Sequence, residues 1–96
     1  MEIIIDGNRH ELPRPTMAMW LKLAELENSE KDSESMVDIL KGRYDIIKEF
    51  YQLDDEEAAK LPVEDILPAY NDMAGHIMKC ALDKLKALPN KETGKE

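Results

Sequence analysis

The sequence predicts a mainly helical α+β fold, in which a short N-terminal β-hairpin precedes a small bundle of three to four helices. Two observations predict this fold. An isoleucine run, a turn and a short polar segment are typical of a hairpin over about residues 2–12. After it, apolar residues recur at spacings of three and four, which is the pattern of amphipathic helices. A chain of 96 residues is long enough for one domain, which we expect over residues 1–88.

The hairpin is expected to pair residues 3–5 with a short second strand. Its turn is Asp-Gly or Gly-Asn, and Gly7 and Asn8 tolerate the positive φ that such turns need. All three strand isoleucines are apolar, and a lone hairpin is marginal in water. We therefore expect one face of the strand to pack on the helices and the other face, or the open edge, to meet a second subunit. The candidate self-association residues are Ile3, Ile4 and Ile5.

The first helix is expected from Thr16, a suitable N-cap, to about Glu27. Pro13 and Pro15 end the strand pairing before it, because proline supplies no donor to a β-ladder. Trp20, the only tryptophan, is expected to anchor this helix to the core. A polar stretch then separates the first helix from the second.

The second helix is expected over about residues 34–53, where apolar side chains again repeat with helical spacing. Gly42 inside this helix costs about 1 kcal/mol relative to alanine, and such a glycine often permits a close approach of two helices. The candidate N-caps of this helix are Asp32, Ser33 and Ser35.

Residues 54–57 are acidic and form a further helix start, with Asp54 as the N-cap. The longest amphipathic stretch of the chain follows. Pro68 interrupts it, because proline removes one backbone hydrogen bond and clashes with the preceding turn. We therefore expect a kink or break there, a main helix over about residues 68–88, and a flexible charged tail over residues 89–96.

The chain carries a formal net charge of −8, unevenly placed. Residues 1–83 hold 9 Lys and Arg against 19 Asp and Glu, a balance of −10, whereas residues 84–96 hold 4 Lys and 2 Glu, a balance of +2. An acidic body repels phosphate backbones, which argues against nucleic-acid binding. The single cysteine, Cys80, forms no intrachain disulfide and favours a reducing cytoplasm. No apolar stretch approaches the ~20 residues of a membrane span, and the isoleucine run is too short for a signal peptide.

No set of residues predicts catalysis or a bound cofactor, and the sequence lacks a nucleophile elbow, a P-loop and a Gly-rich dinucleotide motif. His76 and Cys80 share a helix face, which allows a two-ligand metal half-site, but no further ligand follows at metal-site spacing. The acidic clusters lack the EF-hand pattern and are better explained as helix caps and solvated faces. We therefore predict no catalytic, cofactor or metal site.

Five segments carry a resemblance to a known family. They are residues 3–7 (Ile-Ile-Ile-Asp-Gly), 12–17 (Leu-Pro-Arg-Pro-Thr-Met), 20–23 (Trp-Leu-Lys-Leu), 54–57 (Asp-Asp-Glu-Glu) and 63–71 (Val-Glu-Asp-Ile-Leu-Pro-Ala-Tyr-Asn). In this order they resemble the tail assembly chaperones of long-tailed, siphovirus-type bacteriophages or prophages of Gram-positive bacteria, and the resemblance covers about residues 1–85. It implies that the protein binds the long, helical, aggregation-prone tape measure protein in the host cytoplasm, until tail-tube subunits polymerise around that protein.

The resemblance also implies partners beyond the tape measure protein. These are the tail-tube protein, a form of the same chain extended by a programmed ribosomal frameshift, and further copies of the chain in a homo-oligomer; neither nucleic acid nor membrane is expected. Flexible methionine side chains suit a groove that adapts to amphipathic helices. The candidate partner-binding residues are Met17, Trp20, Tyr70, Met73 and Ile77.

Two other functions compete with the chaperone. An acidic helical regulator or inhibitor, for example an antitoxin-like protein, would mimic nucleic acid with its negative surface. An acyl-carrier-like protein would carry phosphopantetheine on Ser33, since Asp32 and Ser33 precede a helix as in carrier proteins. The Ser33 context reads Asp-Ser-Glu, however, and lacks the apolar residue that carrier proteins have directly after the serine.

Overall fold

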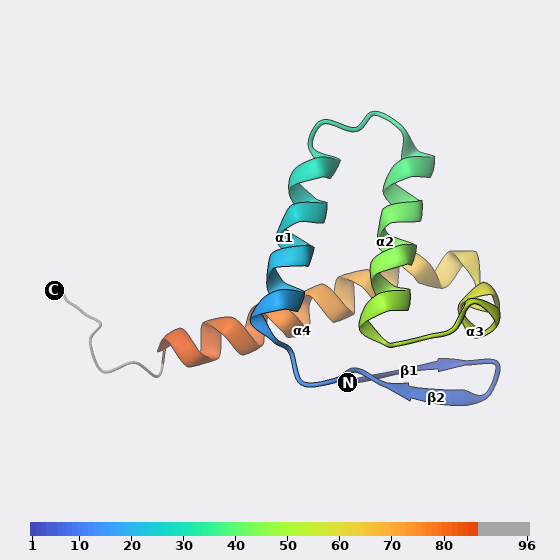
Figure 1. Ribbon diagram of the computed structural model, residues 1–96, viewed down its shortest axis with the longest axis horizontal. Helices are drawn as coiled ribbons and strands as arrows, with labels where there is room; N and C mark the ends of the chain where they lie inside the picture. Colours follow the sequence, from blue (N-terminus) through green and yellow to red (C-terminus); the bar gives the residue numbers. More distant parts are fainter. Residues whose placement is uncertain (87–96) are drawn as a thin grey trace, which may run out of the picture.

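The computed structural model describes the backbone of residues 1–86 and the side chains of residues 1–83, and it confirms the expected hairpin-plus-helices fold (Figure 1). α1 and α2 stand side by side as an antiparallel pair, and α4 runs across both of them. The expected helix end at residue 88 and the tail over residues 89–96 lie outside the described residues. The elements are β1 (Glu2–Ile5), β2 (Asn8–Glu11), α1 (Met17–Glu30), α2 (Met36–Phe50), α3 (Asp55–Ala59), the 3-10 turn η1 (Val63–Asp65) and α4 (Ile66–Lys86).

The hairpin turns at Asp6 and Gly7, which have positive φ angles of 52° and 82°. Of the two turns that the sequence allowed, Asp-Gly is therefore the one formed, as in two-residue hairpins of type I′. Asn8 does not take a positive φ and pairs with Ile5 as the first residue of β2, so the alternative Gly-Asn turn is not formed. The Asp-Gly turn sets this register, and with it which side of β1 faces the helices.

Side-chain caps begin α1 and α2 as the sequence predicts, although neither helix ends at the residue expected from the sequence. The Thr16 hydroxyl accepts a hydrogen bond from the Met19 amide at 3.3 Å, and α1 then continues to Glu30, beyond the expected end near residue 27. Ser35 is the N-cap of α2 among the three candidates, accepting from the Asp38 amide at 3.3 Å. α2 stops at residue 50 rather than 53, because the chain turns out of the helix at a left-handed residue, Gln52.

Gly42 lies where α2 comes close to α1, which confirms the expected role of this glycine. A Cβ atom built at Gly42 would lie 2.9 Å from the Cδ1 atom of Leu26. A larger side chain at this position would therefore force the Leu26 side chain to shift.

α4 corrects the expectation of a break at Pro68. The helix starts at residue 66, directly after η1, and runs unbroken through Pro68. Pro68 is the third residue of the helix, and the first four amides of a helix have no intrahelical partner to lose. One buried stripe then follows the helix into the core, formed by Ile66, Tyr70, Met73 and Ile77.

The hairpin is attached to the helical part through buried isoleucine and two polar contacts. Ile5 is fully buried, and Ile3 packs partly against the same core. The Nε2 atom of His10 lies 3.1 Å from the Glu57 carboxylate on α3. At the turn, the Asp6 carboxylate lies 3.6 Å from the Nζ atom of Lys60. The hairpin therefore packs on the helical body instead of standing free of it.

Candidate functional site

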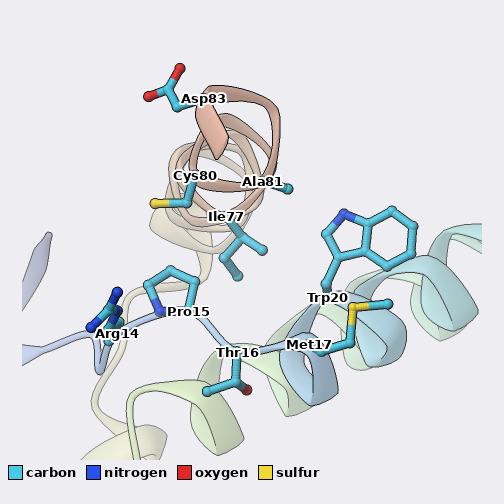
Figure 2. A pocket seen from close by; sticks show the side chains of 9 residues that line it. All are labelled: Arg14, Pro15, Thr16, Met17, Trp20, Ile77, Cys80, Ala81 and Asp83. Atoms are coloured by element: carbon cyan, nitrogen blue, oxygen red, sulfur yellow. The ribbon is translucent and has the colours of Figure 1, made fainter. Parts of the chain in front are cut away.

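Two hollows open between α1 and α4, and Trp20 lines both of them. We call the two hollows together the α1–α4 groove. The first has a volume of about 790 Å³ and is shown in Figure 2. Its lining residues are Arg14, Pro15, Thr16, Met17, Trp20, Ile77, Cys80, Ala81 and Asp83. The second has a volume of about 420 Å³, and its lining residues are Trp20, Leu23, Ala24, Glu27, Asn28, Lys31 and Met78.

The first hollow lies beneath the second half of α4. Figure 2 shows Ile77 pointing from α4 toward the Pro15–Thr16 segment, with Met17 and Trp20 projecting from α1 on one side. Figure 1 shows α4 extending past α1, and the first hollow lies between the second half of α4 and the start of α1.

Large apolar side chains are exposed on both helices that form the groove. On α1, Met17 is 65% exposed and Leu21, one turn further, is 48% exposed. On α4, Met78 is 37% exposed and Leu82, again one turn further, is 46% exposed. Met17 and Met78 line the two hollows, and exposed apolar surface at a concave region is typical of a site that binds another protein.

The charges that line the groove are balanced, although the domain as a whole is acidic. Arg14 and Asp83 line the first hollow, and Glu27 and Lys31 line the second. Within residues 1–83, Arg14 makes no ion pair. The groove therefore presents apolar side chains with one positive and one negative group at each hollow, which suits an amphipathic segment better than a highly charged ligand.

A polar contact holds the wall of the second hollow in place. The Tyr70 hydroxyl on α4 donates a hydrogen bond of 3.0 Å to the Glu27 carboxylate on α1. Burial of the phenol, together with this hydrogen bond, raises the pKa of Tyr70 above its ordinary value. Tyr70 therefore stays neutral and keeps α1 joined to α4 at this point.

The structure brings together three of the five residues expected to bind a partner. Met17, Trp20 and Ile77 all line the first hollow. Tyr70 and Met73 lie in the core instead, with exposed fractions of 3% and 0%. The sequence pattern missed a second apolar stripe on α4, whose exposed members are Leu67, Met78 and Leu82. This stripe lies beside the buried one, and the spacing of Met78 and Leu82 was the signal for it.

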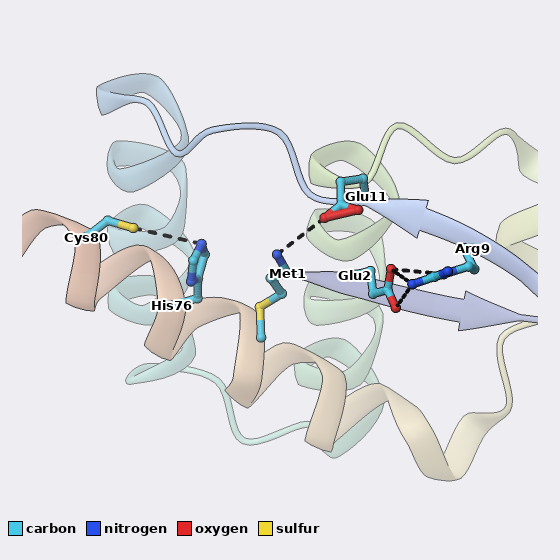
Figure 3. Close-up of polar contacts among 6 residues, drawn as sticks. All are labelled: Met1, Glu2, Arg9, Glu11, His76 and Cys80. Atoms are coloured by element: carbon cyan, nitrogen blue, oxygen red, sulfur yellow. Dashed lines mark hydrogen bonds and ion pairs between the residues drawn. The ribbon is translucent and has the colours of Figure 1, made fainter.

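The three isoleucines expected to mediate self-association lie in different surroundings. Ile5 is buried, Ile3 is partly buried against the core, and Ile4 is 60% exposed on the opposite face of β1. Ion pairs border that face: Arg9 lies 2.8 Å from Glu2, and the Met1 amine lies 3.5 Å from Glu11 (Figure 3). The hydrogen bonds from Arg9 hold the pKa of Glu2 below its usual range.

His76 and Cys80 lie close together on α4, as their spacing predicts. The Nε2 atom of His76 is 3.9 Å from the Cys80 Sγ atom (Figure 3). Within the part of the chain that the structure describes, no three His, Cys, Asp or Glu side chains form a group that could hold a metal ion. The acidic cluster at residues 54–57 serves as a helix start, where Asp54 accepts a hydrogen bond of 2.7 Å from the Glu57 amide.

Ser33, the candidate attachment site of a carrier protein, is a loop residue. It lies between α1 and α2, and its hydroxyl accepts a hydrogen bond of 3.4 Å from the Ser35 amide. The N-cap role belongs to Ser35, two positions later. Ser33 is thus separated from the start of α2, which is not the helix-start position that a carrier serine occupies.

No protein-family model, curated protein or solved structure matches this chain. Among residues 1–86, no helix combines the length and the apolar character needed to cross a bilayer. Among the described residues, the α1–α4 groove is the feature that best suits the binding of another molecule.

Proposed function

We propose that this protein is a tail assembly chaperone of a long-tailed phage or prophage, which binds the tape measure protein in the cytoplasm of its bacterial host. The observation that carries the proposal is the α1–α4 groove, where exposed apolar side chains flank Trp20. The order of segments that resembles this chaperone family supports the same conclusion. The tail-tube protein and a frameshift-extended form of this chain are further partners under the proposal.

The groove suits one amphipathic helix of the client. A helix laid between α1 and α4 would set its apolar stripe against Met17, Trp20 and Met78, in the helix-in-groove mode of peptide recognition. Methionine side chains adjust to different apolar surfaces, so one groove can accept several segments of a long client. The acidic remainder of the surface keeps the complex soluble.

Charge favours a client segment over a second copy of the chain as the occupant of the groove. Residues 1–83 have a balance of −10, so two copies repel each other at long range. A client helix with Lys and Arg beside its apolar stripe is attracted instead. We therefore assign the groove to basic amphipathic helices of the tape measure protein.

Self-association is the second part of the proposal, and it uses a different surface. Ile4 is the member of the isoleucine run that faces solvent, on the hairpin face away from the core. Both edges of a two-stranded sheet are open to pairing, so the hairpin can meet another hairpin without blocking the groove.

Co-expression with the tape measure protein encoded in the same phage or prophage tests the proposal. The wild-type chain is expected to raise the soluble fraction of that protein, and Met17→Glu to abolish the gain. Met36→Glu is a matched control. Both methionines are the first residue of a helix, follow a hydroxyl N-cap and are highly exposed, at 65% and 72%, but Met36 is at the far end of the α1–α2 pair. The new charge therefore acts on the helix dipole alike in both variants.

Three results would contradict the chaperone function. The first is a tape measure protein that stays insoluble with the wild-type chain. The second is equal activity of the Met17→Glu and Met36→Glu variants, which would move the binding surface away from the groove. The third is a pull-down from producing cells that returns a nuclease or a DNA-binding protein and no tape measure protein, which would favour an inhibitor that mimics nucleic acid.

A further inference from the structure

The two described glycines inside long helices differ in their surroundings. At Gly42 in α2, an added Cβ would meet Leu26 at 2.9 Å, so close packing of α1 accounts for this glycine. At Gly75 in α4, an added Cβ would meet nothing within 4 Å, and the backbone does not adopt a positive φ. Glycine in a helix interior weakens the helix by admitting other backbone conformations. Close packing therefore does not explain why position 75 is a glycine, whereas a role in local backbone flexibility does.

Gly75 lies next to the point where α4 loses its cover. The last buried residue described in the helix is Ile77, which is 2% exposed. From Met78 to Asp83 every described side chain is exposed or half-buried, although Met78 and Leu82 are large and apolar. The first half of α4 is thus fixed by the core, and the second half is held mainly by its own backbone hydrogen bonds.

The uncovered half also has room to move. The hollow of about 790 Å³ lies between this part of α4 and the segment that leads into α1 (Figure 2). Its volume is in the range of sites that enclose a small ligand or several side chains of a peptide. Movement of α4 about Gly75 would widen or narrow this hollow and leave Tyr70 and Met73 in the core, while Ile77, which lines the hollow, would move with the second half of the helix.

We propose that α4 bends at Gly75, so that residues 78–86 act as a jaw that closes on a client helix lying in the α1–α4 groove. The inference rests on the proposed function, since the client helix is the occupant. The open jaw admits the helix, and Met78 and Leu82 then gain the apolar contact that they lack in the free protein. Closure slows release of the client more than it affects its entry, because contacts made after docking act on dissociation.

The variant Gly75→Ala tests the hinge, with Asn71→Ala as its control. Both positions are exposed on α4, and both substitutions raise helix propensity, but Asn71 lies one turn nearer the fixed end. Each is expected to raise the Tm by about 2–6 °C. Only Gly75→Ala should stiffen the junction between the fixed and the uncovered half.

Spin labels report the movement without any client. In a Cys80→Ser background, labels at Lys79→Cys and Glu25→Cys give the distance between the jaw and α1. A broad distribution is expected for the free chain and for Asn71→Ala, and a narrow one for Gly75→Ala. A free chain with the narrow distribution of Gly75→Ala overturns the hinge, whatever the client does.

A synthetic basic amphipathic helix from the tape measure protein then tests closure. Binding should narrow the distance distribution of the wild type. Because closure slows release and Gly75→Ala stiffens the junction, this variant should raise the dissociation rate of the peptide by about tenfold. Peptide binding that leaves both quantities unchanged overturns the jaw and leaves the chaperone function standing. A peptide set that never binds the wild type overturns the chaperone function, and closure with it, even if the free helix bends.

Discussion

Arg43 of α2 holds the carboxylate of Glu30 on α1 with two hydrogen bonds, of 2.9 Å from Nε and 3.1 Å from Nη2. The same guanidinium lies 4.6 Å from the centre of the Tyr70 ring on α4. One arginine thus touches all three long helices, through the forked geometry that suits a carboxylate and a flat face that stacks on an aromatic ring. The hydrogen bonds to Glu30 raise the pKa of Arg43 further above its ordinary value.

Glu30→Ala is expected to lower the free energy of unfolding by about 1–3 kcal/mol, because it leaves a largely buried guanidinium without its partner. The two side chains are only 23% and 14% exposed, so solvent screens the pair weakly. Replacing both partners, with Arg43→Met and Glu30→Leu, should cost less than Glu30→Ala alone. Urea unfolding followed by circular dichroism measures both.

The exposed pair of Lys41 and Asp45, 3.3 Å apart, provides the control for that experiment. Its members are 71% and 57% exposed, and Asp45→Ala should change the free energy of unfolding by less than about 0.5 kcal/mol. An effect of Glu30→Ala as small as that of Asp45→Ala would show that Arg43 does not hold the helices together.

Local chemistry explains what the sequence could predict of the fold. The Thr16 and Asp54 caps, the Asp-Gly turn and the close approach at Gly42 each depend on neighbours in the chain or on a single missing Cβ. The error at Pro68 has a local cause too. A proline is harmless in the first turn of a helix and disruptive further in, and the short η1 turn, which the sequence pattern did not reveal, fixes where α4 begins.

The candidate site was harder to predict because it depends on how much of α4 is covered. Tyr70, Met73 and Ile77 share one buried stripe, and the spacing of apolar residues cannot tell that Ile77 lines the first hollow whereas Tyr70 and Met73 do not. The contact between Arg43 and Glu30 shows the same limit. These residues are 13 positions apart on two helices, and no periodic pattern links them.

Tyr70→Phe is expected to lower the free energy of unfolding by about 0.5–1.5 kcal/mol at neutral pH, because the hydrogen bond to Glu27 is lost. The pKa of Tyr70 is raised in the folded protein, so the unfolded chain releases this proton first as the pH rises above about 10. The stability that the Tyr70 hydroxyl contributes is therefore fully present below that pH and falls above it.

The difference between wild type and Tyr70→Phe should accordingly shrink as the pH rises beyond about 10. Urea midpoints of the two proteins, compared at neutral and alkaline pH, measure this change. Burial also raises the pKa of Tyr51, but Tyr51 is present in both proteins and cancels in the comparison. A difference that stays constant into the alkaline range would mean that the Tyr70 phenol titrates normally in the folded protein.

Ile4→Asp is expected to weaken self-association while leaving the melting temperature within about 2 °C of wild type, because the Ile4 side chain is 60% exposed. Sedimentation equilibrium and thermal unfolding measure the two effects. Val63→Asp is the matched control, since Val63 is 67% exposed and belongs to η1, outside the hairpin. If both variants have the wild-type association state, the hairpin is not the assembly surface.

Salt should act in opposite directions on the two kinds of association. The chain has a net charge of −8, so added salt screens the repulsion between copies and strengthens self-association. The same screening weakens attraction to a basic client helix, and the Kd of the complex with that helix should rise by about tenfold between low and high salt.

Trp20 is the only tryptophan and lines both hollows of the groove, so its fluorescence reports client binding directly. Met17→Glu adds a negative charge beside Trp20, which strengthens attraction to basic residues while it disrupts the apolar contact. If apolar contact dominates in the groove, this variant binds more weakly at every salt concentration, whereas tighter binding at low salt would show that charge alone recruits the client.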